Sequence, residues 1–151
     1  MDLEFNNAGT IDTQGTGWFV GYSEWAKAKM AGTLDVRYIP RDMLCHSLCM
    51  KWMFHQEGDL SGLIKPISEG RTVAILVSSR SRMRLHFSEQ ETFPEGQIVE
   101  RVLEQHGQFA AWGAGIFHRC FFDTDCTILT LRWTPVQNPN AGIPKFQATT
   151  E

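Results

Sequence analysis

The sequence has none of the features that mark membrane, secreted or nucleic-acid-binding proteins. No apolar run comes near the ~20 residues of a membrane span, and the start, Met1–Phe5, lacks the basic and apolar regions of a signal peptide. Positive charge is not in excess, because 14 Lys and Arg stand against 17 Asp and Glu. Such a chain offers no broad cationic surface to phosphate backbones or anionic lipid. We therefore expect a cytoplasmic protein with neither nucleic acid nor membrane as a partner.

Cysteine is also scarce, with four residues in a chain of 151. A chain of this length can build a core without disulfides, so we expect reduced thiols. Cys45 and Cys49 flank His46, but this one cluster lacks the paired Cys-x2-Cys knuckles of a structural zinc site. We interpret Cys49 and Cys126, which lie among apolar neighbours, as buried small apolar residues.

The common catalytic motifs are missing as well. The sequence contains no Gly-x-Ser-x-Gly elbow, no Walker loop, no Gly-x-Gly-x-x-Gly after a strand and no His-Glu-x-x-His. It therefore leaves open whether the protein is an enzyme.

The length and composition indicate one compact domain with flexible ends. A chain of 151 residues, 42% of them hydrophobic, has material for a single core. Residues 1–17 are polar and rich in Gly, Asn and Thr, which predicts a flexible N-terminal arm. The domain is expected over 18–135, with a short helical segment at Glu24–Met30, and a tail over 136–151.

Most of the domain shows the pattern of β-strands. Between residues 48 and 55, apolar side chains alternate with period two, and because both faces are partly apolar we expect both to be covered. The apolar run at 72–77 predicts a buried strand, from which 82–87 is expected to return as a hairpin. Residues 97–104 fit helical spacing, but their neighbours favour a strand. Two further strands, 116–122 and 126–133, are expected to form a second hairpin.

One segment carries a family resemblance. Gly113-Ala114-Gly115-Ile116-Phe117-His118 resembles the second motif of the cupin superfamily, Pro-x-Gly-x-x-His, with Gly113 in place of the proline. The strand that follows, 127–135, continues as a cupin does, and 72–79 resembles the strand and turn of the first motif. The resemblance covers 70–135 and implies an all-β, cupin-like (RmlC-like) double-stranded β-helix, or jelly-roll barrel.

The chain departs from the family at the metal ligands of the first motif. The family would place two histidines near Pro66 and Ser68 and a glutamate near Arg71, and none of these residues matches. A cationic side chain at a carboxylate position would repel a metal ion. We therefore expect a divergent member without the standard first metal motif. If a divalent transition metal binds, the candidate ligands are His118, His55 and His86.

The resemblance points to a ligand site in the mouth of the barrel. The motif directs His118 inward, where a neutral imidazole can donate or accept a hydrogen bond. Lys51 and His55 share one strand face and are expected to enter the same cavity. Lys65, Glu69 and Arg71 precede the buried strand, where cupins display residues that contact ligands, and an ordinary polar loop is an equally good interpretation of them. The leading hypothesis is a small-molecule-binding protein whose ligand is polar or anionic.

Other functions stay open beside this one. The first is a metal-dependent cupin enzyme of the isomerase or dioxygenase type. The second is a non-catalytic regulatory or interaction protein, a homodimer that pairs through the apolar edge near Trp18 and Tyr22, since cupin-like domains commonly dimerise through such strands. Arg82 and Arg84 could also bind an anion through bidentate contacts, although a solvated face is favoured for them.

Overall fold

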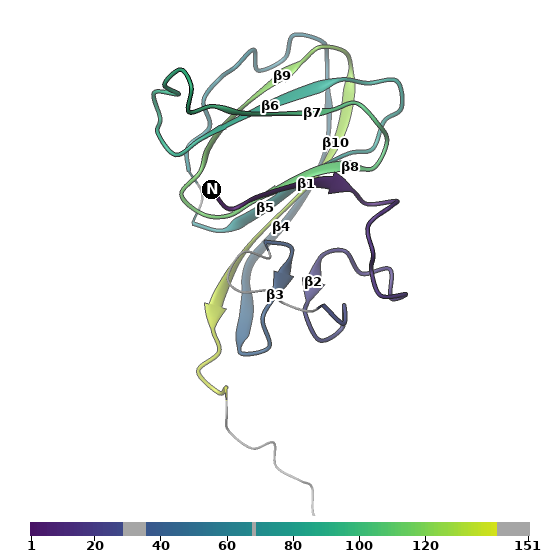
Figure 1. Cartoon of the computed structure of the whole chain (residues 1–151), viewed down its shortest axis with the longest axis vertical. Helices are drawn as coiled ribbons and strands as arrows, with labels where there is room; N and C mark the ends of the chain where they lie inside the picture. The colour runs from purple at the N-terminus through teal and green to yellow at the C-terminus, as the bar shows by residue number, and fades with distance from the viewer. Residues whose placement is uncertain (29–35, 68, 142–151) are drawn as a thin grey trace, which may run out of the picture.

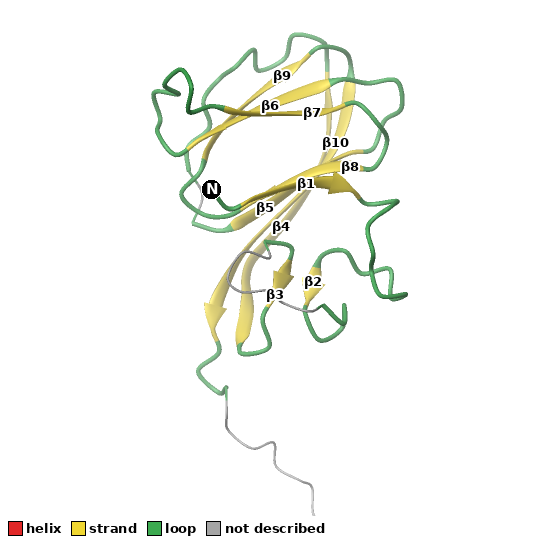
Figure 2. Cartoon of the chain, in the orientation of Figure 1, coloured by secondary structure: helices red, strands yellow, loops and turns green. Residues whose placement is uncertain are grey.

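The computed structural model describes residues 1–28, 36–67 and 69–141, and this part of the chain contains strands but no helix (Figure 1, Figure 2). The ten strands are β1 (Leu3–Asn7), β2 (Gly21–Tyr22), β3 (Tyr38–Ile39), β4 (Met43–His55), β5 (Arg71–Leu76), β6 (Met83–Ser88), β7 (Val99–Leu103), β8 (Gln108–Trp112), β9 (Phe117–Phe122) and β10 (Cys126–Gln137). The all-β prediction is confirmed, and so is the choice of a strand within 97–104.

The expected helical segment at Glu24–Met30 is wrong over its described residues, 24–28. These residues form turns, in which the Trp25 amide donates to the Tyr22 carbonyl and the Ala28 amide to the Ser23 carbonyl. Residues 29 and 30 lie outside the described part. No helix of the described residues has the length and apolar character needed to cross a membrane.

Two antiparallel sheets face each other and form the barrel (Figure 1). The larger sheet has the strand order β1-β8-β5-β10-β4, and the smaller has the order β7-β6-β9. The fold is a cupin-type jelly roll, in which strands that follow one another in sequence often belong to opposite sheets.

This topology overturns both expected hairpins. β5 pairs with β8 and β10, whereas β6 pairs with β7 and β9. β9 and β10 are likewise in different sheets. The turns after β5 and after β9 therefore carry the chain from one sheet to the other. Alternation within a strand predicts which side chains share a face, but it does not predict the partner strand.

The space between the sheets holds the main core. Met83, Leu85 and Phe87 of β6 are buried there, as their alternation predicts. Phe87 packs against Trp112 of the opposite sheet, with ring centroids 5.1 Å apart. These contacts tie the two sheets together on the inner side of the barrel.

A second core lies on the other face of the larger sheet. Val36 and Ile39, at the short parallel pair β2-β3, pack with Val73 and Ile75 of β5 and with Trp133 of β10. Because β5 is covered on both faces, its sequence is a continuous apolar run rather than an alternating one.

The predicted N-terminal arm contributes a strand to the barrel. Within residues 1–17, β1 pairs with β8 along its whole length. The Glu4 carboxylate accepts a 2.6 Å hydrogen bond from Nε of the buried Arg37. At the other end of the domain, β10 continues through Pro135 to Gln137, two residues into the predicted tail.

The long strand β4 forms an edge of the larger sheet and is covered on neither face over most of its length. In the described part it pairs with β10 alone. The prediction that both faces of 48–55 are covered is therefore wrong. Cys49 is exposed as well, whereas Cys126 is buried as expected. The alternation shows that the segment is a strand, but its composition does not reveal that the strand is an edge.

Candidate functional site

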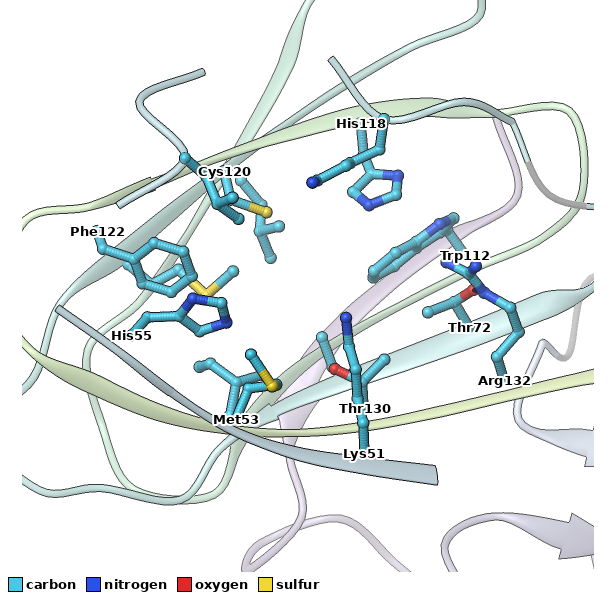
Figure 3. Close-up of a pocket in the computed structure, with 16 residues that line it drawn as sticks. Lys51, Met53, His55, Thr72, Trp112, His118, Cys120, Phe122, Thr130 and Arg132 are labelled. Carbon is cyan, nitrogen blue, oxygen red and sulfur yellow. Dashed lines mark hydrogen bonds between the residues drawn. The ribbon is translucent and has the colours of Figure 1, made fainter. Parts of the chain in front are cut away.

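A cavity of about 210 Å³ opens between the two sheets, and its lining comes from β4, β5, β6, β8, β9 and β10 together with the loop after β4 (Figure 3). Its two ends differ in chemistry. Figure 3 shows His118, Trp112 and Arg132 toward one end and His55 and Phe122 toward the other.

Positive charge gathers at the first end. Lys51 on β4, Lys65 on the loop and Arg132 on β10 all line the cavity, and Lys51 and Arg132 are exposed at its mouth. The Lys65 amide donates to the His118 carbonyl at 2.9 Å, which holds the loop beside β9. Arg132 Nε donates to Thr72 Oγ1 at 3.1 Å. Among the described residues that line this cavity there is no Asp or Glu, so no carboxylate of the lining offsets the three cations.

His118 projects into the cavity from β9 and is 8% exposed. Its ring lies 4.9 Å from that of Trp112. Burial, and after it the charges of Arg132, Lys65 and Lys51, lowers the pKa of His118 to about 4. The imidazole is therefore neutral at pH 7. Its buried Nδ1 has no hydrogen-bond partner within residues 1–28, 36–67 and 69–141, which leaves that atom available to a bound molecule.

The other end of the cavity is largely apolar. His55 stacks on Phe122, with ring centroids 4.1 Å apart and an interplanar angle of 13°. Its Nδ1 lies 3.4 Å from Oδ2 of Asp59. Burial raises the pKa of the Cys120 thiol to about 12, although Lys65 and Lys51 act in the opposite direction. This thiol stays protonated at neutral pH and is a poor nucleophile.

The structure brings together four of the six residues considered for ligand binding. The same cavity is lined by His118, His55, Lys51 and Lys65, and their role in binding stays a prediction. Arg71 and Glu69 do not line it. Arg71 is the first residue of β5, and its side chain lies on the opposite face from that of Thr72. There its Nη1 donates to the Tyr38 carbonyl at 2.7 Å. Glu69 is exposed in the bend before β5.

The candidate metal ligands do not converge. His86 lies on the outer face of β6, where its Nε2 is 2.7 Å from Oε2 of Glu100 and its Nδ1 accepts from Arg119 Nε at 3.2 Å. Within the described ranges, no group of three or more His, Cys, Asp and Glu residues could hold a metal ion. The remaining pair, His118 and His55, shares its cavity with three cations, which oppose a divalent metal. The residues present therefore do not fit the metal centre of the family.

The site includes residues that the sequence reasoning did not select. Arg132, Thr130 and Thr72 line the cavity. Arg132 could have been found by counting forward along β10 in steps of two from the buried Ile128, because residues at even spacing share a face of the strand.

The basic residues on the outer face of β6 differ from those in the cavity, because acidic partners accompany them. Arg84 donates to both carboxylate oxygens of Asp123, and Arg82 pairs with Asp123 and Glu104. The hydrogen bond from Arg84 is the main reason that the pKa of Asp123 lies below its ordinary value. These pairs leave the outer face with little free positive charge for an anion.

Comparisons with known proteins give no family match but several similar solved structures. No family model matches the sequence, and the search of curated proteins found no match. One similar structure is HEPD from Streptomyces albus with its substrate 2-hydroxyethylphosphonate and Fe(II) bound, at a TM-score of 0.45 and 12% identity over 63% of this chain and 19% of that one. Another is Fe(II)-bound HppE, at a TM-score of 0.46 and 8% identity over 60% and 49%.

A third similar structure is RmlC from Streptococcus suis in complex with dTDP-D-xylose, at a TM-score of 0.41 and 16% identity over 63% of this chain and 47% of that one. The chain thus spans less than a fifth of HEPD and about half of HppE and RmlC. The strand order of this chain itself shows the jelly-roll arrangement.

Proposed function

We propose that this protein binds a small organic anion, with a carboxylate or phosphate group, in the mouth of the barrel. The observation that carries the proposal is the cluster of Lys51, Lys65 and Arg132 around one cavity whose described lining contains no carboxylate. Cationic groups at the mouth of a low-dielectric cleft attract anions and concentrate them there. Ammonium and guanidinium groups also form the stronger, charge-assisted hydrogen bonds with such ligands.

The two ends of the cavity suit two different parts of a ligand, one anionic and one apolar. The anionic group would lie between the three cations, within reach of the Thr130 hydroxyl and the neutral His118 ring. The rest of the molecule would extend toward Met83, Leu85 and Phe122, where apolar atoms are buried at about 25 cal/mol per Å². We therefore expect an anion that carries an apolar or aromatic group to bind more tightly than inorganic phosphate.

Calorimetric titration with matched probes tests the proposal. Phenylacetate supplies a carboxylate and an aromatic ring, and phenylacetamide is its neutral counterpart. We expect phenylacetate to bind at least tenfold more tightly, because a hydrogen bond to a charged group contributes about 1.5–3 kcal/mol. Equal affinities for the two probes, or no binding of phenylacetate, butyrate or phosphate at millimolar concentration, would refute the proposal.

Two arginine variants test whether the affinity for phenylacetate arises at the cavity. Arg132→Met removes a cation of the mouth and should weaken the binding of phenylacetate at least tenfold. Arg41→Met changes the net charge of the protein by the same amount. However, the Arg41 side chain is 87% exposed and pairs with Glu24 outside the barrel. This control should bind phenylacetate as the wild type does. A loss of the same size in both variants would show a general charge effect and no specific site.

A further inference from the structure

A second cavity lies outside the barrel, on the other face of the larger sheet. This outer pocket is lined by residues 17–22, Ile39, Cys45, Leu48, Leu131 and Trp133, and its volume is about 480 Å³, against about 210 Å³ for the cavity between the sheets. Pockets for drug-sized molecules usually measure about 300–1,000 Å³. The outer pocket is therefore large enough for an organic molecule.

The alternation of β10 separates the two cavities. Thr130 and Arg132 line the barrel cavity, so Leu131 and Trp133 point to the opposite face of the sheet, where they line the outer pocket. Figure 1 shows β2 and β3 on this side of the larger sheet, away from β6, β7 and β9. A molecule in the outer pocket would thus be separated from the barrel cavity by the sheet itself.

Hydrogen bonds hold the wall of the outer pocket in place. The buried Arg37 donates from Nη1 to the Phe19 carbonyl at 2.6 Å, and its Nε donates to the Glu4 carboxylate. The Tyr22 hydroxyl accepts from the Cys45 amide at 3.2 Å, which ties β2 to β4. A wall that is fixed in this way does not have to be ordered when a ligand binds, which lowers the entropic cost of binding.

The chemistry of the outer pocket differs from that of the barrel cavity. Among the described residues that line it there is no charged side chain. A charged group placed there would lose its hydration without gaining a partner, which is costly. Its side chains offer hydrogen-bond donors, namely the Tyr22 hydroxyl, whose oxygen already accepts from an amide, and the buried Trp133 Nε1, which has no partner within the described ranges. The outer pocket therefore suits an uncharged molecule that carries an acceptor.

We propose that the outer pocket binds an uncharged, largely apolar small molecule whose carbonyl or other acceptor meets the Tyr22 hydroxyl. Ile39 and Trp133, at the floor, are 4% and 1% exposed, whereas Trp18 and Leu48, at the rim, are 53% and 67% exposed. A folded partner would cover the rim alone, but a small molecule also fills the space above the floor. Each Å² of apolar surface that it buries contributes about 25 cal/mol.

Fluorescence titration with an uncharged aromatic ketone, 6-propionyl-2-(dimethylamino)naphthalene, tests the proposal, because its emission shifts to the blue in apolar surroundings. We expect saturable binding and displacement by 2-acetylnaphthalene. The anion 2-naphthoate has the same ring system and should displace the fluorescent ketone at least about tenfold less well, since its charge finds no partner. No binding of the fluorescent ketone at micromolar concentration, or equal displacement by the two competitors, would overturn the proposal.

Two variants of β4 assign the binding to the outer pocket. Leu48 and Met50 are 67% and 69% exposed on the same face of the strand, but of the two only Leu48 lines the outer pocket. Leu48→Asp should weaken the binding of the fluorescent ketone at least about fivefold, whereas Met50→Asp should leave it unchanged. Equal losses would contradict the assignment. Leu48→Asp should also bind phenylacetate as the wild type does, which separates this test from that of the barrel cavity.

Tyr22→Phe tests the hydrogen bond to the ligand. The variant should bind 2-acetylnaphthalene about 2–10-fold more weakly, the usual range for one neutral hydrogen bond. The hydrocarbon 2-ethylnaphthalene, which has no acceptor, should bind to both proteins equally. Equal changes for the two compounds would refute the role of the hydroxyl. If the affinity for the ketone falls as the protein concentration rises, a second copy of the chain covers the outer pocket and the proposal is wrong.

Discussion

The buried imidazole of His118 predicts how the stability of the protein responds to acid. The folded protein holds this group neutral, because burial and the nearby cations lower its pKa from 6.5 to about 4. In the unfolded chain the same group gains its proton near pH 6.5. Between these two values the unfolded state binds more protons than the folded state, so the free energy of unfolding falls as the pH falls.

The size of the effect follows from the difference between the two pKa values. Each pKa unit corresponds to about 1.4 kcal/mol, so the full shift amounts to about 3 kcal/mol. This contribution is fully present above pH 6.5 and is lost progressively toward pH 4. At pH 4.5 we expect the loss to have reached about 2–3 kcal/mol. For a domain with a total stability of about 5–15 kcal/mol, a loss of this size is easily measured.

Urea unfolding at several pH values, with wild type and His118→Gln side by side, measures this contribution. The glutamine side chain does not titrate, while the other ionisable groups are common to both proteins and largely cancel in the difference. The stability of the wild type relative to the variant should therefore fall between pH 7 and pH 4.5. Parallel pH profiles would refute the buried, neutral imidazole. A bound anion should raise the pKa of His118, which NMR titration of its ring protons would detect.

Two further predictions concern the core and the thiols. Phe87→Ala should lower the free energy of unfolding by about 3–5 kcal/mol in urea denaturation, because the ring is fully buried against Trp112. A cost below about 1 kcal/mol would contradict this packing. Ellman's reagent should modify the exposed Cys49 in the native protein but Cys120 only after unfolding, since burial raises the pKa of that thiol to about 12. Rapid modification of Cys120 in the folded protein would count against its burial.

The sequence predicts well which side chains of one strand share a face. Period-two alternation assigns Met83, Leu85 and Phe87 to the inside of the barrel, and it also sets Lys51 and His55 on one face. Both results depend only on neighbouring residues, whose side chains must point to opposite sides of an extended backbone.

The features that the sequence does not predict depend on strands that are distant in the chain. The apparent hairpins failed because β5 and β9 each find their partners elsewhere, through pairings that cross between the sheets. Arg71 shows the same limit at the site. Both faces of β5 are apolar, so alternation alone does not show that Arg71 lies on the face of the second core, where it donates to the Tyr38 carbonyl.

The double covering of β5 determines how this fold tolerates change. A strand with one face in water can accept polar residues at every second position, as the outer residues of β6 illustrate. In β5, Val73 and Ile75 pack into one core, and Ala74 and Leu76 pack into the other. Neither of the two sets of alternate side chains therefore reaches solvent. Sequence variation compatible with this barrel is therefore confined to its rim and outer strands, while the central strand admits only apolar substitutions of similar volume.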